Sequence, residues 1–115
     1  MLSMNAASRA YAAASVNRTT RQQEADVFRL IIARLQASRQ AGPIAQVRAL
    51  ADNRRLWMAV SDLVRDSNNN LPVETRAGLI SIGLTVQREM DAEAPNFDFL
   101  IAINKNVADG LSGEN

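Results

Sequence analysis

The chain has no cysteine and no histidine. Without cysteine there is no disulfide and no thiolate nucleophile, and without histidine the commonest proton-transfer side chain near neutral pH is missing. Together these absences remove the usual protein ligands of zinc, copper and haem iron. The sequence also has no glycine-rich loop of the kind that cradles phosphates. We therefore expect a protein that is not an enzyme, with no catalytic residue, no metal site and no cofactor.

Long apolar runs and a strong charge of either sign are also missing. The longest apolar runs are Leu30–Ala33 and Leu56–Val60, far short of the roughly 20 residues that cross a membrane. Polar side chains interrupt the residues before Ala12–Ser15, which argues against an export signal, and both Met1 and Met4 are plausible starts. Thirteen basic residues against twelve acidic ones leave a net charge of +1, so bulk charge does not indicate a nucleic-acid partner. We expect a cytoplasmic protein that neither inserts into membranes nor binds nucleic acid directly.

Hydrophobic residues make up 47% of the 115-residue chain and charged residues 22%, which is typical of one folded domain. Apolar residues recur at helical spacing, and no stretch shows the alternation of a β-strand. Proline, glycine and asparagine mark the breaks, which predicts five helices, at about 5–15, 21–41, 43–66, 72–92 and 97–111. The third of these has a potential break near Asp52. The sequence thus predicts a single all-α bundle over residues 1–115, with residues 1–4 and 112–115 frayed.

The predicted helix Pro72–Ala92 is apolar over more than half of its circumference. One apolar stripe contains Val73, Ala77, Ile80 and Leu84. Counting about 100° per residue along the helix, a second apolar stripe lies well away from the first. It contains Leu79, Ile82, Val86 and Met90. A helix of this kind either lies at the centre of a bundle or presents a groove to a partner. We expect it to be central, and we take its second stripe, together with Leu30, as candidate partner contacts.

Two adjacent arginines, Arg54 and Arg55, are further candidate partner contacts. They are able to bind a phosphate group, but no aromatic residues alternate with them as they do in RNA-binding surfaces. Asp52 and Asp62 are close to them in the sequence. The interpretation that we favour is a solvated or ion-paired surface.

Trp57, Asn53 and Asn104 are candidate structural residues. Trp57 is the only tryptophan, falls on an apolar stripe and is expected in the core, where its indole N–H needs an acceptor. Each asparagine projects onto the apolar side of its helix, and a buried amide must be hydrogen-bonded. We favour a structural role, in which each asparagine caps a helix end or break or forms a core link that fixes helix register. The alternative is a polar contact inside a partner-binding groove.

Four stretches of the sequence together resemble one family, and their order and separation match over nearly the whole chain. They are Ala10–Ala12, Asn53–Trp57, Leu71–Ser81 and Leu100–Leu111. The pattern N-R-R-L-W followed by L-P-x-x-x-R-x-x-L-I-S is fairly specific as a pair. On these residues the chain resembles the FlaF flagellar biosynthesis regulators of alphaproteobacteria.

The resemblance implies a cytoplasmic factor needed for the production and export of flagellin. Members of the family look like chaperone-type proteins that bind flagellin and act with the flagellin translation repressor FlbT. A second reading is a post-transcriptional regulator that contacts flagellin mRNA directly. The near-neutral charge of the chain favours the first reading.

Overall fold

The computed structural model describes residues 20–113, and these residues form four helices and no strand. The helices are α2 (Thr20–Ser38), α3 (Pro43–Arg65), α4 (Val73–Met90) and α5 (Phe97–Ser112). This confirms the predicted all-α bundle, with four described helices in place of about five. The helix expected at 5–15 lies outside the described residues. At the other end, α5 continues through Ser112, where we expected fraying.

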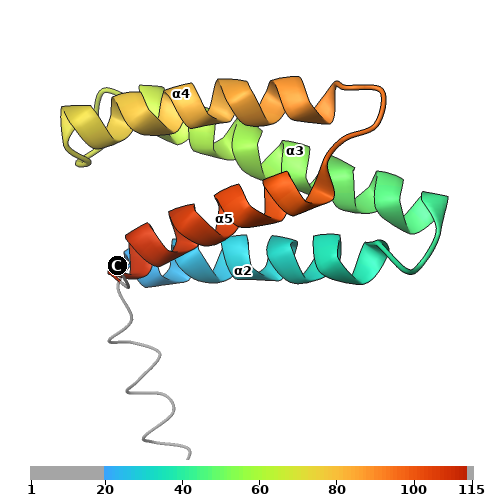
Figure 1. The fold of residues 1–115 in the computed structure, drawn as a ribbon. Helices are drawn as coiled ribbons and strands as arrows, with labels where there is room; N and C mark the ends of the chain where they lie inside the picture. The colour runs from blue at the N-terminus through green and yellow to red at the C-terminus, as the bar shows by residue number, and fades with distance from the viewer. Residues whose placement is uncertain (1–19, 114–115) are drawn as a thin grey trace, which may run out of the picture.

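The helices pack as two pairs that share a common interface (Figure 1). Helix α2 lies along α5, α3 lies along α4, and α2 also packs against α3. The loop 91–96 joins α4 to α5 at one end of the bundle, and from there the two helices diverge (Figure 1). The bundle is therefore closed where α4 meets α5 in the chain and wider at the opposite end.

The helix ends follow local sequence signals. Gly42 adopts a positive φ of 93° and Pro43 occupies the first position of α3, as the Gly-Pro pair predicts. Asn96 caps α5, because its side-chain oxygen accepts a hydrogen bond from the Phe99 amide at 3.1 Å. Helix α3 runs without a break through Asp52, since the Asn53 side chain is hydrogen-bonded in the core and does not cap a new helix.

The core lies between α2, α3 and α5. Trp57 of α3 is at its centre with no exposed surface, and Phe28 of α2 meets it edge-on, with ring centroids 5.7 Å apart. Around these two rings pack aliphatic side chains from all four described helices, among them Ile31, Ile32, Leu35, Val86, Met90, Leu100 and Ile101.

Helix α4 is not central, contrary to the expectation for Pro72–Ala92. It packs mainly against α3, and only Gly83, Val86 and Met90 are buried. The central place is taken by α3, whose Trp57 fills the space between the helices. Gly83 allows α4 to approach that ring, because a Cβ there would already lie 3.5 Å from Trp57 Cε3. The apolar stripe from Val73 to Leu84 consequently lies largely outside the core.

Candidate binding groove and the buried amide chain

A chain of hydrogen bonds between side chains crosses the core. Trp57 Nε1 donates to Asn104 Oδ1 at 2.9 Å, and Asn104 Nδ2 donates to Asn53 Oδ1 at 2.7 Å. Asn53 Nδ2 then faces the sulfur of Met90 at 3.2 Å and donates to it. We call these four residues the amide chain; three of them, Trp57, Asn53 and Asn104, are completely buried. The amide chain links α3 to both α4 and α5.

The amide chain satisfies the polar groups that burial would otherwise penalise. Among the described residues, no buried side-chain nitrogen or oxygen lacks a hydrogen-bond partner. The two asparagines bond to each other, so of the two structural roles expected for them, helix cap and core link, the hydrogen bonds form the core link. The physical reason is that both face the same interior space from neighbouring helices. Because the bonds have fixed partners, they also hold α3 and α5 in one register.

An apolar groove lies at the wider end of the bundle. Its volume is about 520 Å³, and every described helix contributes to its lining. Leu56 and Val60 of α3 lie along it, with Val107 and Leu111 from α5. Further lining residues are Thr20, Arg21, Glu24, Val27, Phe28, Ala59, Leu63, Val64, Asn69, Asn70, Leu71 and Leu79. We refer to this set as the groove.

Two side chains of the groove are unusually exposed for large apolar residues. Val27 of α2 has 50% of its surface exposed and Leu63 of α3 has 52%. Burying apolar surface is worth roughly 25 cal/mol per Å², so these side chains gain stability when something covers them. A concave apolar surface with a partly polar rim is the usual form of a binding site.

The groove stays open because α4 is held against α3 at this end. Arg76 of α4 donates from Nε to the Val64 carbonyl at 2.9 Å and from Nη2 to the Asp66 carbonyl at 3.3 Å. The preceding turn is fixed as well, since Asn69 Nδ2 donates to the Leu63 carbonyl and Asn69 Oδ1 accepts from the Leu71 amide. These contacts satisfy the free carbonyls at the end of α3. They tie the first turns of α4 to α3 and leave α5 apart.

The residues expected to contact a partner are divided between surface and core. Leu79 lines the groove, and Ile82 is partly buried against the core. Val86 and Met90 are core residues, so their side chains are not part of the surface. Leu30 is half exposed on α2 but does not line the groove. Periodicity placed Val86 and Met90 on one face correctly, but could not tell that this face packs against α3.

Sequence reasoning missed the groove residues Val27 and Leu63. Both recur at helical spacing with the core residues of their helices, and both lie at the edge of that apolar stripe. Edge positions become exposed where neighbouring helices diverge, which depends on the arrangement of the bundle and not on the helix itself. The sequence therefore shows that both residues are apolar, but it does not show that they are exposed.

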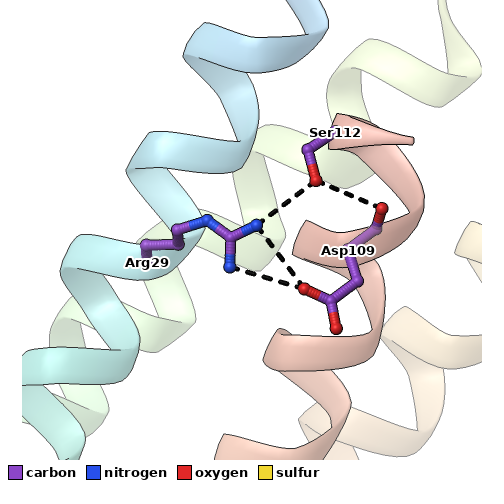
Figure 2. Close-up of polar contacts among 3 residues, drawn as sticks. All are labelled: Arg29, Asp109 and Ser112. Carbon is purple, nitrogen blue, oxygen red and sulfur yellow. Dashed lines mark hydrogen bonds and ion pairs between the residues drawn. The ribbon is translucent and has the colours of Figure 1, made fainter. Parts of the chain in front are cut away.

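Five arginines of the described surface pair with carboxylates. Arg54 pairs with Asp91 at 2.9 Å and Arg55 pairs with Asp52 at 3.0 Å, so the adjacent arginines form the ion-paired surface that we favoured. Further pairs are Arg34–Asp52, Arg39–Asp98 and Arg29–Asp109. Figure 2 shows how Arg29 of α2 reaches Asp109 and the Ser112 hydroxyl near the end of α5. Such exposed pairs are worth little individually.

Residues 20–113 contain neither a membrane-spanning helix nor a cluster of metal-ligating side chains. No helix there is long and apolar enough to cross a membrane. No three acidic side chains come together in a way that would hold a metal ion.

Comparison with known protein families shows to which family the chain belongs. The model of one family, described as "Flagellar protein FlaF", matches residues 7–111. The chain belongs to the FlaF family. Comparisons with curated proteins and with solved structures gave no significant match.

The sequence stretches that resemble FlaF proteins have distinct places in this structure. Asn53–Trp57 supplies two members of the amide chain, and Leu100–Leu111 supplies Asn104. Leu71–Ser81 supplies two groove residues, Leu71 and Leu79, and the arginine that ties α4 to α3. The FlaF match therefore covers both the groove and the amide chain that supports it.

Proposed function

We propose that this FlaF-family protein is a non-enzymatic binding protein for flagellin. The groove is the observation that carries the proposal, because it leaves apolar side chains exposed on a protein whose buried polar groups are all paired within the described residues. Membership of a flagellar family supports a flagellar partner. The absence of histidine and cysteine from the sequence supports binding over catalysis.

The proposed ligand is the apolar face of an amphipathic helix in a terminal segment of flagellin that would otherwise self-associate. Helices dock in grooves by placing residues at i, i+3 or i+4 and i+7 into an apolar channel. The groove offers such a channel between α3 and α5, with Val27 on one side and Leu79 on the other. Covering the client's apolar face would keep it unassembled in the cytoplasm until export.

The proposed action together with FlbT follows from the family resemblance. Direct contact with flagellin mRNA is the alternative. The pairing of Arg54 and Arg55 with aspartates gives this alternative little support, because such carboxylates repel phosphates and compete for the guanidinium groups.

Titration calorimetry with purified flagellin tests the proposal. We expect binding with a negative heat-capacity change, the marker of apolar burial. No binding at high micromolar concentration, with both partners folded, would contradict the proposal. A parallel titration with flagellin mRNA is expected to show no tight complex, whereas an RNA affinity that falls steeply with salt would favour the alternative.

A further inference from the structure

We propose that two copies of this chain associate through a shallow hollow on the outer side of the α3–α4 pair. The hollow has a volume of about 200 Å³, and every described residue that lines it belongs to one of these two helices. Its lining includes Met58, Asp62 and Arg65 of α3 with Ile80 and Leu84 of α4. We call this surface the outer hollow. The function proposed above concerns the groove, so this inference goes beyond it.

The outer hollow is separate from the groove. Leu56 and Val60 of α3 line the groove. At about 100° per residue, Met58, Asp62 and Arg65 project from the opposite side of the same helix. A partner in the outer hollow therefore leaves the groove free.

The apolar part of the outer hollow belongs to the α4 stripe that the core does not use. Leu84 is about half exposed, as is Met58 beside it on α3. The same stripe of α4 begins at Val73, which is 76% exposed. Helix α4 packs mainly against α3 and lies at the outside of the bundle (Figure 1). Contiguous exposed apolar surface with polar residues around it is typical of a protein–protein contact.

Two opposite charges indicate which protein fits this surface. Asp62 and Arg65 are both exposed, and within the described part of the chain neither side chain has an ion pair or a hydrogen bond. The outer hollow thus offers one acid and one base. A partner with a strong charge of a single sign would match only one of them. A surface with the same two charges in reverse order matches both, and a second copy of this chain presents such a surface.

A two-fold axis brings these charges together. In a two-fold dimer each copy uses the same surface, so the surface must be complementary to itself. Asp62 and Arg65 are about one turn apart on α3. Antiparallel pairing of the two α3 helices about an axis between these residues sets each Asp62 opposite the other copy's Arg65. The net charge of +1 adds little repulsion between the copies.

Sedimentation equilibrium of the full-length protein at low salt tests the inference. The surface is small, so we expect a dissociation constant of roughly 10–500 µM. The average mass should rise with concentration from the monomer value of 12.6 kDa toward twice that value. A single monomeric species up to about 1 mM would overturn the inference.

Charge reversal tests the pairing itself. Asp62→Arg and Arg65→Asp each set like charges opposite one another, so each variant alone should associate at least about tenfold more weakly. In an equimolar mixture of these two variants the opposed charges are complementary again, and association should return to the wild-type level. Lys105→Asp, on the exposed surface of α5, changes the net charge as much as Arg65→Asp does and should leave association unchanged. A mixture that stays monomeric would overturn the inference.

A matched pair of leucines tests the apolar part. Leu84 and Leu30 are 49% and 50% exposed, but Leu30 lines neither the outer hollow nor the groove. Leu84→Asp should prevent association and Leu30→Asp should not, with circular dichroism confirming that both variants are folded. Equal association in the two variants, or a dimer lost only in Leu63→Asp, would show that the copies meet elsewhere. Flagellin binding that is weakened by Leu84→Asp and not by Leu63→Asp would make the outer hollow the client's site and overturn the inference.

Discussion

The two halves of the bundle contain similar apolar side chains but bury them to different extents. In the closed half, toward the loop 91–96, side chains of α3, α4 and α5 meet, and Leu100 and Asn104 have no exposed surface. In the open half, around the groove, Val27 and Leu63 keep about half of their surface exposed. The same kinds of residue are thus fully buried around the amide chain and in part exposed along the groove.

The difference comes from where α4 is attached. In the closed half Met90 accepts a hydrogen bond from Asn53, which in turn bonds Asn104 of α5. In the open half Arg76 directs α4 to the carbonyl groups at the end of α3. The closed half can therefore supply the stability of the fold, which leaves the open half free to bind. This separation predicts that substitutions in the two halves have different consequences.

The largest effect is expected for Trp57, which stands between the two halves. Trp57→Ala removes a fully buried indole, its hydrogen bond to Asn104 and its contact with Phe28. A loss of about 3–5 kcal/mol is expected for such a truncation, which is enough to unfold many domains of this size. Urea denaturation followed by far-UV circular dichroism measures it. A folded variant with an unchanged midpoint would contradict the position of Trp57 at the centre of the core.

A smaller effect is expected for the amide chain in the closed half. Asn104→Ala leaves the Trp57 indole N–H and the side-chain oxygen of Asn53 without partners. The free energy of unfolding should fall by about 1–3 kcal/mol as a result. The matched control is Asn106→Ala on the exposed side of the same helix, where the unfolding midpoint should stay nearly constant. If Asn104→Ala instead melts like the wild type but binds flagellin more weakly, the asparagine serves the partner and not the fold.

A still smaller effect is expected for the ion pair between α2 and α5. Arg29 and Asp109 are each about two-fifths exposed, and their closest atoms are 3.5 Å apart. Asp109→Asn should therefore lower stability by about 0.2–1 kcal/mol, and the difference should shrink at high salt. Thermal melts at low and high salt measure it. A loss as large as that from Asn104→Ala would show that this surface contact matters as much as the buried one.

Much of the fold was predictable because it depends on local signals. Gly42-Pro43 and Asn96 marked the helix boundaries, and helical spacing placed Trp57, Asn53 and Asn104 on inward faces. The partners of the two asparagines could not be predicted, since these residues are far apart in the sequence and periodicity does not specify which helices face each other. The peripheral position of α4 was missed for the same reason.

The site was less predictable than the fold. Val27 and Leu63 resemble core residues in the sequence, and only the divergence of the helices exposes them. Val86 and Met90 look like partner contacts in the sequence, because they lie on the second apolar stripe of a helix that already has one. Exposure is a property of the space between helices, so a helix considered alone does not reveal it.

The central claim, that the groove binds flagellin while the closed half maintains the fold, is tested most directly by two substitutions on one helix. Leu63 lines the groove and Met58 does not, yet the two are almost equally exposed, at 52% and 54%. Each is changed to aspartate, and unfolding and flagellin affinity are measured on the same samples. Both variants should keep the wild-type free energy of unfolding to within about 0.5 kcal/mol. Leu63→Asp should weaken binding at least about tenfold, or roughly 1.4 kcal/mol, with Met58→Asp unchanged; equal affinities in the two variants would contradict the claim.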